Sequence, residues 1–284
     1  MPGGLLGPAE VRDLAELLDV SPTKKLGQNF VVDGNTVRKI VRAAQLVPGE
    51  TVLEVGPGLG SLTLGLLEAG HPVAAVEIDP RLAAQLPTTV ALQQPDAPAL
   101  EVLLHDAMTV TSLPEPAGAA PTALVANLPY NVSVPVLLHL LEHFPNLQRT
   151  LVMVQAEVGQ RLAAQPGSKV YGAPSAKAAW YGPWRLAGTI SRQVFWPVPN
   201  VDSILVGFVR QAAPGTEEER KATFQVIDAA FGQRRKMMRQ ALAELMGSST
   251  VAVEVMERAG IDPTARGEAL GVLDFLAIAR AWKG

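Results

Sequence analysis

The chain has 284 residues, of which 48% are hydrophobic and none is cysteine, and its formal net charge is −3. This length allows one large domain and a small one, each with a buried core, and the composition is that of a folded protein. The lack of cysteine excludes disulfides, thiolate metal sites and cysteine nucleophiles. Because the net charge is slightly acidic, a nucleic-acid-binding surface would have to come from local clusters of basic residues.

The amino-terminal residues do not have the pattern of a signal peptide. Glu10, Asp13 and Glu16 lie among the first apolar residues, and no basic run precedes them. Residues 116–141 lack Asp, Glu, Lys and Arg, but their four prolines and several polar side chains are unsuited to a lipid-spanning helix. We therefore expect a soluble, cytoplasmic protein with no membrane-spanning segment.

After a short amphipathic helix within the first ~20 residues, apolar runs alternate with segments of helical spacing. Strands are expected at residues 51–55, 73–77, 102–104, 123–126 and 150–155, and helices at 36–45, 61–69, 81–86, 132–142, 157–164 and 174–180. This alternation is typical of an α/β protein with a mostly parallel sheet and helices on both faces. Two later strands, at 184–191 and 203–210, are too close together for an intervening helix and predict an antiparallel edge.

A change of composition marks the expected domain boundary. Residues 211–215 are small, polar or Gly and Pro, and the pattern after them is purely helical. We expect a sheet-containing domain over residues 1–212 and a small all-helical domain over residues 213–284.

A glycine-rich loop follows the first strand and precedes a helix. Gly56, Gly58 and Gly60 have the spacing G-x-G-x-G, which lets a ligand lie against the main chain beside free amides at the helix start. A dinucleotide fingerprint would place glycine where Ser61 stands, and the lysine of a nucleotide-binding P-loop is missing. Taken alone, the run is also compatible with a plain tight turn.

Two acids at the ends of the next two strands indicate which ligand the glycine-rich loop would bind. Glu77 ends the second strand, where a carboxylate can accept hydrogen bonds from both hydroxyls of a ribose. Asp106 follows the third strand and can accept a hydrogen bond from an adenine amine, although a turn cap explains it equally well in isolation. Glycines, Glu77 and Asp106 in series favour an adenosyl nucleoside, and the glycine spacing favours S-adenosylmethionine.

The motif after the fourth strand suits methyl transfer to an adenine amine. The lone pair of that amine is delocalised into the ring, so Asn127 Oδ1 and the Leu128 carbonyl could each accept an N6–H and redirect it toward the methyl group. Pro129 would hold the loop extended, and Tyr130 offers a flat ring on which an extruded base can stack. Orientation and proximity are then the main sources of rate. A β-turn is the alternative interpretation of the motif by itself.

Two further features are weaker. Phe195 begins a stretch with two aromatic residues and two prolines between the late strands, and we expect it to form the opposite wall of a base pocket. A hairpin packed on the core is the alternative. His139 and His143 have a helical spacing that could hold a metal, but no third ligand is evident and we expect no metal.

Basic residues concentrate in two places. Residues 21–45 contain Lys24 and Lys25 among five basic residues and one acid, and residues 231–240 contain Arg234, Arg235 and Lys236 with no acid. A solvated helix face is the plain interpretation of such runs. Two of them on an acidic chain favour a surface that binds phosphates.

Four motifs in this order resemble a known family. Residues 25–30, 54–60, 127–130 and 195–203 are similar to the corresponding motifs of bacterial small-subunit rRNA adenine dimethyltransferases, over roughly residues 24–239. The resemblance implies a Rossmann-like class I methyltransferase sheet with a small helical domain. It also implies transfer of four methyl groups from S-adenosylmethionine to two adjacent adenosines in the 3′-terminal hairpin of 16S rRNA. In that family the substrate is the immature 30S subunit, late in ribosome assembly, and we expect the enzyme to be a monomer.

The resemblance also assigns roles to individual residues. Asn29 and the backbone of Val31 would contact the methionine end of the cofactor, and Gly56 would lie under it. Glu77 would hold the ribose, Asp106 the adenine, and Asn127 would bridge cofactor and target. Two departures from the family pattern are Val31 in place of leucine and Met237-Met238 after the basic run, where small polar residues are usual.

Three related classes remain as alternatives. The 23S rRNA erythromycin-resistance methylases share the asparagine motifs, but their glycine loop looks more like G-x-G-K-G than Gly56–Gly60 does. Mitochondrial transcription-factor relatives use the fold as a binding module, against which the intact Glu77 and Asn127 argue. DNA adenine methylases normally carry Asp-Pro-Pro-Tyr in place of residues 127–130.

Overall fold

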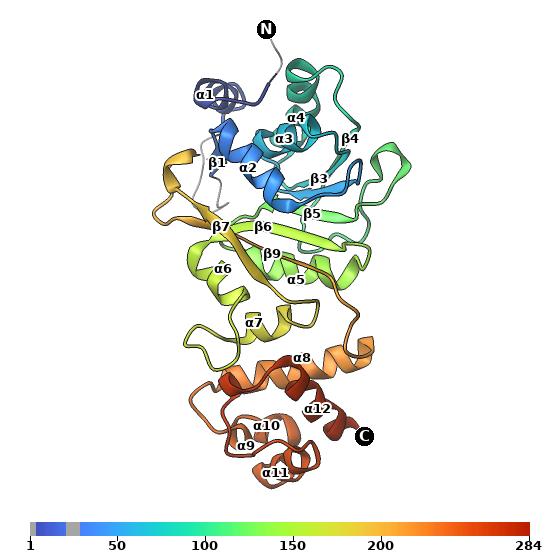
Figure 1. The fold of residues 1–284 in the computed structure, drawn as a ribbon, viewed down its shortest axis with the longest axis vertical. Coiled ribbons are helices and arrows are strands. Elements are labelled where there is room, and N and C mark those ends of the chain that lie inside the picture. The colour runs from blue at the N-terminus through green and yellow to red at the C-terminus, as the bar shows by residue number, and fades with distance from the viewer. Residues whose placement is uncertain (1–3, 21–28) are drawn as a thin grey trace. The chain divides into compact units, whose positions relative to one another are not determined.

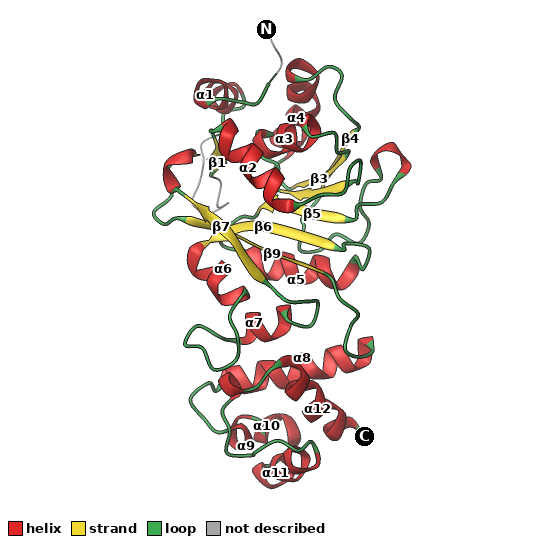
Figure 2. Ribbon diagram, viewed as in Figure 1, coloured by secondary structure: helices red, strands yellow, loops and turns green. Residues whose placement is uncertain are grey.

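The computed structural model describes residues 4–20 and 29–284, which form two compact units (Figure 1). The first unit comprises the described residues up to 159 together with 185–210, and the second comprises 160–184 together with 211–284. The first contains the sheet, and the second is built of helices, as the colours of Figure 2 show. Lys24 and Lys25 lie outside the described residues.

A seven-stranded sheet organises the first unit, in the order β4-β3-β2-β5-β6-β9-β7. Its parallel strands are β2 (Val52–Val55), β3 (Val73–Glu77), β4 (Leu100–Leu104), β5 (Ala123–Asn127) and β6 (Arg149–Gln155). The last two, β9 (Ser203–Val209) and β7 (Arg185–Ile190), run antiparallel. Both the parallel sheet and its antiparallel edge are therefore as the sequence predicts.

The burial of each strand depends on whether it lies at the centre or at the edge of the sheet. All residues of β2 and β3 are buried, whereas the edge strand β4 is partly exposed and the edge strand β7 is largely exposed. Central parallel strands are covered on both faces, which is why they read as continuous apolar runs. From β2 the chain first builds the sheet in one direction, through β3 and β4, and then in the other, through β5 and β6. At such a reversal a crevice opens at the carboxyl ends of the two central strands, here β2 and β5.

Helices cover the two faces of this sheet (Figure 1). In this view α2 (Gly34–Ala44), α3 (Ser61–Glu68) and α4 (Pro80–Gln93) lie on one side and α5 (Ser133–His143) on the other. The helix α1 (Pro8–Leu17) packs its buried Val11 and Ala15 into the same core as α2. Side chains cap α2 and α4 at their starts: Asp33 accepts from Thr36 N at 2.7 Å and Asp79 from Arg81 N at 2.9 Å.

The helix α4 is longer than the sequence predicts. The pattern indicates a helix near residues 81–86. Pro87 comes next, and a proline lacks the N–H that a helix interior needs. The structure continues α4 through Pro87 to Gln93. Leu82, Leu86 and Val90 are all buried on its inner face, and this packing outweighs the lost hydrogen bond.

A second, two-stranded sheet joins distant parts of the sequence. β1 (Phe30–Val31) pairs antiparallel with β8 (Phe195–Trp196), with Phe30 opposite Trp196 and Val31 opposite Phe195. Two short 3-10 turns, Pro116–Gly118 and Arg192–Val194, complete the first unit. No local pattern predicts this pairing.

The second unit has its own hydrophobic core. Its helices are α7 (Ala173–Ala178), α8 (Glu217–Gly232), α9 (Met238–Ala241), α10 (Ala243–Met246), α11 (Ser249–Arg258) and α12 (Val272–Lys283), with a 3-10 turn at Gly267–Ala269. Phe275, Val226 and Leu242 are fully buried at its centre. The chain enters this unit within α6 (Ala156–Leu162).

Residues 160–184 group with the C-terminal helices, so the division of the chain differs from a single boundary at 212. Tyr171 is 1% exposed in the core of the second unit, and its hydroxyl donates to the Leu270 carbonyl at 2.9 Å. Gly167 N donates to the Glu268 carbonyl at 2.7 Å. These contacts join segments about a hundred residues apart in sequence, which no composition break reveals.

The uncharged stretch at 116–141 forms a 3-10 turn, the buried strand β5 and most of α5. Within the described part of the chain, no helix combines the length and apolar character needed to cross a membrane.

Candidate active site

A cavity of about 220 Å³ lies in the first unit at the carboxyl ends of its central strands. It is the crevice expected where the order of a parallel sheet reverses. Polar groups from several strand ends meet apolar side chains there, as is usual for a cofactor site. The lining residues are 29–31, 54–59, Ser61, Leu62, 76–78, Leu82, 105–108, Asn127, Pro129, Asn131, Val132 and Val136.

Residues 56–59 of the glycine-rich loop line this cavity, and Gly60 follows them. Gly58 has φ +60°, and a Cβ added there would lie 2.8 Å from the Phe30 ring. Gly60 has φ +98°, and a Cβ there would lie 2.7 Å from Leu86. Both positions therefore require glycine, for backbone conformation and for space. Gly56, the third glycine, also lines the cavity.

Glu77 is buried at the end of β3, with its carboxylate held by backbone amides. Oε1 accepts from Ile78 N at 2.9 Å and Asp79 N at 3.0 Å, and Oε2 accepts from Gly58 N at 3.1 Å. The Gly58 bond ties the acid directly to the glycine loop. Burial raises the pKa of Glu77, while these three amides act in the opposite direction.

Glu54 is a second buried acid in the same cavity, with no role predicted from the sequence. It is 1% exposed in β2 and accepts a hydrogen bond from Thr63 Oγ1 at 2.6 Å. Burial and, to a smaller extent, the nearby Glu77 carboxylate raise its pKa to about 8, against the opposing effect of the Thr63 hydrogen bond. A positively charged ligand bound beside these two carboxyls would favour their ionised forms.

Ser61 contributes a buried hydroxyl that also went unassigned. It is 6% exposed at the start of α3, and the structure records no hydrogen-bond partner for its Oγ within the described residues. A buried hydroxyl without a partner is unfavourable, and the first amides of a helix also lack partners within it. A ligand with an anionic or polar group at this end of the loop would satisfy both.

Asp106 lies at the rim of the cavity beyond β4. It is exposed, lines the cavity, and its Oδ1 accepts from Met108 N at 2.8 Å, so it also caps a turn. Ile78 and Met108 add apolar surface at the same rim and are 55% and 41% exposed. In the sequence, only their positions mark these two residues: Ile78 directly follows Glu77, and Met108 lies two residues after Asp106. A flat apolar group with a polar edge fits this rim.

Asn127 joins the carboxyl end of β5 to the amino-terminal segment. Its Nδ2 donates to the Asn29 carbonyl at 3.0 Å, and both residues line the cavity. A carbonyl oxygen can only accept a hydrogen bond, so the amide nitrogen of Asn127 must face Asn29. The Oδ1 atom of Asn127 therefore points away from Asn29, where it can act as an acceptor. Val31, two residues further, is buried in β1 and also lines the cavity.

The other residues of the motif at 127–130 have different surroundings. Pro129 lines the cavity, 3.8 Å from where a Cβ on Gly56 would lie. Leu128 is 1% exposed and donates its backbone N–H to Met153 O at 3.1 Å. Tyr130 is half-buried, and its hydroxyl is bonded to Ser203 Oγ at 2.5 Å; burial raises its pKa. The loop is thus anchored on β6 and β9.

Phe195 does not lie where the sequence analysis expects it. It is 2% exposed, belongs to the hydrophobic core of the first unit, and is not among the residues that line the cavity. Its backbone pairs with Val31, which turns the side chain inward. The neighbouring Trp196 stacks on Phe30, with ring centroids 6.4 Å apart.

The histidine pair at 139 and 143 is engaged in local contacts. The rings are 4.1 Å apart, His139 Nε2 bonds to Val110 O, and His143 Nδ1 to His139 O. In the described residues no cluster of three or more His, Asp or Glu could hold a metal.

The basic residues at 234–236 lie in the turn between α8 and α9 rather than on a helix. All three are exposed. Arg234 also supports the second unit, because it donates to the Lys169 carbonyl at 2.8 Å and pairs with Glu268 at 3.3 Å. The helix α8 ends at Gly232, before this basic run begins.

Solved structures share this fold. A dimethyladenosine transferase from Plasmodium falciparum superposes with a TM-score of 0.70 at 22% identity, over 87% of this chain and 94% of its own. The 23S rRNA methyltransferase ErmE superposes with a TM-score of 0.64 at 25% identity, over 90% of this chain and 100% of its own. These neighbours confirm the Rossmann-like methyltransferase sheet with an added helical part.

Sequence relatives are closer. The chain is 65% identical over 277 residues to ribosomal RNA small subunit methyltransferase A of Leifsonia xyli, covering 97% of this chain and 98% of the relative. The protein of the same name from Streptomyces griseus is 60% identical over 280 residues, covering 98% and 95%. The sequence model of the ribosomal RNA adenine dimethylase family matches residues 21–283 of this chain. Because this match and the alignments with both relatives extend over nearly the whole chain, the chain belongs to the ribosomal RNA adenine dimethylase family.

Proposed function

We propose that this protein transfers methyl groups from S-adenosylmethionine to N6 of two adjacent adenosines in the 3′-terminal hairpin of 16S rRNA. Family membership and the names of the relatives at 60–65% identity support the reaction and the small-subunit substrate. The observation that carries the proposal is the bond from Asn127 to Asn29, which orients an amide acceptor at the edge of the cavity.

The cavity suits the parts of S-adenosylmethionine one by one. Glu77 is placed to accept from the ribose hydroxyls, and Asp106 with the apolar rim to receive the adenine. The Ser61 hydroxyl, with Asn29 and the Val31 backbone, is suited to the amino-acid end, over Gly56. A cationic ligand would interact favourably with the ionised forms of the buried carboxyls Glu54 and Glu77, and would favour their ionisation on binding. When bound, this cofactor supplies an electrophilic methyl group on a positively charged sulfur.

The residues at 127–130 would prepare the adenine amine for attack. Asn127 Oδ1 and the Leu128 carbonyl each accept one N6–H, which draws the nitrogen lone pair out of conjugation and toward the cavity. Pro129 keeps this part of the loop extended. The Tyr130 ring, tied to Ser203 through its hydroxyl, is the stacking surface for a base removed from its helix. When the N6 lone pair takes the methyl group from the sulfur, the nitrogen becomes positively charged and acidic enough to lose a proton to solvent, so no strong base is needed.

Recognition of the RNA would come from outside the cavity. The exposed Arg234, Arg235 and Lys236 of the second unit are suited to phosphate contacts, as are Lys24 and Lys25. Phe195 is left out of the proposed base pocket, because its burial in the core leaves no surface for a base. The proposal places a monomeric enzyme on an immature 30S subunit in the cytoplasm.

The test compares two RNA substrates. The protein is incubated with methyl-labelled S-adenosylmethionine and either undermethylated 30S subunits or large-subunit rRNA, and labelled positions are mapped by nuclease digestion and mass spectrometry. We expect N6,N6-dimethyladenosine at two adjacent positions of the 3′-terminal hairpin, and no transfer with Asn127→Ala. Label in large-subunit RNA instead would assign the protein to the erythromycin-resistance type, and no label on either substrate would refute the reaction.

A further inference from the structure

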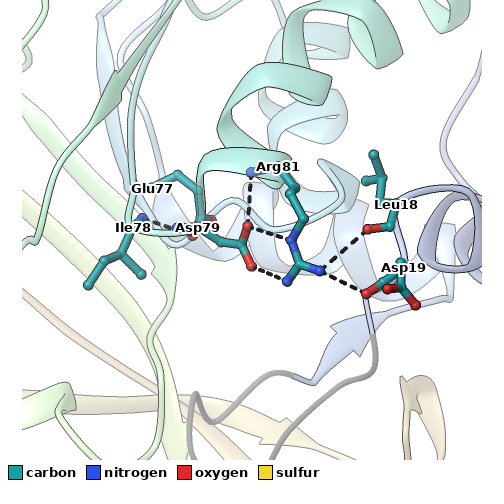
Figure 3. Close-up of polar contacts among 6 residues, drawn as sticks. All are labelled: Leu18, Asp19, Glu77, Ile78, Asp79 and Arg81. Atoms are coloured by element: carbon teal, nitrogen blue, oxygen red, sulfur yellow. Dashed lines mark hydrogen bonds and ion pairs between the residues drawn. The ribbon is translucent and has the colours of Figure 1, made fainter.

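The side chain of Arg81 joins two parts of the first unit that are about sixty residues apart in sequence (Figure 3). On one side its guanidinium forms a bidentate pair with Asp79, through Nε at 3.2 Å and Nη2 at 2.8 Å. On the other, Nη1 donates to the Asp19 carbonyl at 2.8 Å and, over a longer 3.5 Å, to the Leu18 carbonyl. One side chain therefore makes contacts in two directions.

The Asp79 contact leads directly to the acid that is suited to the ribose. Asp79 is 7% exposed, and its backbone N–H donates to Glu77 Oε1 at 3.0 Å. The turn at 77–79 thus holds two carboxylates of the same sign, both largely buried. Arg81 supplies the positive charge beside them, and its side-chain hydrogen bond holds the pKa of Asp79 below its usual range. Without that charge, mutual repulsion would favour a different conformation of the turn.

The carbonyl contacts lead to the end of α1. Leu18 and Asp19 follow the last turn of this helix, where unpaired carbonyls carry partial negative charge. A guanidinium placed there satisfies the carbonyls and interacts well with the helix end. The body of α1 is fixed independently, because Val11 and Ala15 are buried in the core of the unit. The end of α1 is therefore a firm point to which Arg81 can hold Asp79.

We infer that Arg81 is a positioning residue for the cofactor: by tying Asp79 to the end of α1, it fixes the turn that presents Glu77 to the ribose. The inference rests on the proposed function, because it takes the adenosyl group as the ligand of Glu77. Exposed ion pairs are usually of little consequence. This one differs because its acid is buried and its geometry is bidentate, with side-chain exposures of 48% for Arg81 and 6% for Asp79.

The matched control is Arg38, which makes the same kind of contact without reaching the turn. It pairs with Glu68 through Nε at 2.9 Å and Nη2 at 2.8 Å, and its side chain is 45% exposed. Arg38→Ala therefore removes an equal charge and an equal hydrogen-bond pair from the same unit. Arg81→Lys keeps the charge but loses the planar fork that reaches both the carboxylate and the carbonyls.

The experiment measures binding of S-adenosylhomocysteine to the full chain by calorimetry, with melting temperatures to verify folding. We expect affinity to fall on the order of tenfold in Arg81→Ala, as when a group that orients a binding side chain is removed. Arg81→Lys should show a smaller loss, and Arg38→Ala none. In methylation assays Arg81→Ala should raise KM for S-adenosylmethionine and leave kcat within about twofold, since Arg81 touches no reacting atom.

The outcomes separate this inference from the function on which it rests. If the native chain binds the probe and Arg81→Ala binds as Arg38→Ala does, the positioning role is overturned alone. A fall in melting temperature with unchanged affinity, or a loss in kcat with unchanged KM, overturns it as well. If Arg81→Ala does not fold, native affinity in Arg81→Lys overturns it. If the native chain does not bind the probe, both the proposed function and this inference fall.

Discussion

The side-chain amide of Asn127 donates a hydrogen bond to the backbone carbonyl of Asn29, across 3.0 Å and 98 positions of sequence. The bond joins the carboxyl end of a central strand to the segment that precedes β1. It also fixes which way the amide faces, and an amide acceptor that is held in place needs no reorganisation when a substrate arrives. The first prediction follows from this contact.

Asn127→Ala should abolish most turnover while leaving cofactor affinity nearly unchanged. The substitution removes the acceptor for the adenine amine, and loss of one such preorganised group typically costs about 100- to 1000-fold in kcat. Single-turnover methylation of undermethylated 30S subunits measures the rate, and calorimetry with S-adenosylhomocysteine measures affinity. Asn146→Ala, at an exposed asparagine of the same unit, is the control. A rate within threefold of the native one would remove Asn127 from the chemistry.

Glu77→Gln should weaken S-adenosylhomocysteine binding by about 10- to 100-fold, because hydrogen bonds to a charged acceptor contribute about 1.5–3 kcal/mol. The melting temperature should also fall, since a glutamine has one acceptor oxygen for the three amides that the carboxylate now satisfies. Calorimetry and a thermal melt measure the two effects. Glu101→Gln, an exposed acid in β4, should change neither. Native affinity in Glu77→Gln would exclude the ribose assignment.

Glu54→Gln should flatten the dependence of stability on pH. The pKa of Glu54 is about 8 in the folded chain and near 4.5 when exposed, so between these values the folded state binds the extra proton. Its contribution is complete below about pH 4.5 and is lost as pH rises through 8. The native chain should lose roughly 3 kcal/mol more than Glu54→Gln between pH 5 and 8.

Denaturant unfolding at several pH values gives the free energy of unfolding of both proteins as a function of pH. The slopes of these two curves are then compared. Glu77, whose pKa burial also raises, has the same sign and remains in both proteins, so a residual slope is expected. Comparing slopes rather than absolute stabilities cancels any constant cost of the buried glutamine amide. Parallel curves for the two proteins would mean that Glu54 is ionised in the native state.

Replacing Arg235 and Lys236 by alanine should weaken binding to 30S subunits and reduce its salt dependence. Each phosphate contact contributes roughly 0.7 to 0.9 to the slope of log affinity against log salt, so the slope should fall by about 1.5. Adding Arg234→Ala should also lower the melting temperature, because Arg234 bonds to Lys169 and Glu268 within the second unit.

The control for this change is the pair Lys221→Ala and Lys283→Ala, which removes the same charge from α8 and α12. Filter binding or sedimentation over a range of salt concentrations gives the slopes. Equal slopes for the two double variants would show that the turn at 234–236 contributes only general charge.

The sequence by itself determined the sheet, the order of its strands along the chain and several of the residues that meet at the cavity. Apolar runs at 52–55 and 73–77 are buried on both faces, and this local property is visible in composition alone. Gly58, Glu77, Asp106 and Asn127 could be assigned to one cavity because parallel strands end at the same edge of a sheet. Connectivity and periodicity were sufficient for these features.

Only the tertiary structure decided which distant segments meet. The pairing of Val31 with Phe195 turned an expected pocket wall into a core residue, and α4 continued through Pro87 because its inner face is buried. The Arg81 contact with Asp19, and the packing of Tyr171 among the C-terminal helices, likewise join positions far apart in the chain. Such contacts depend on how the chain folds back on itself, and a periodic pattern carries information only about a residue's nearest neighbours.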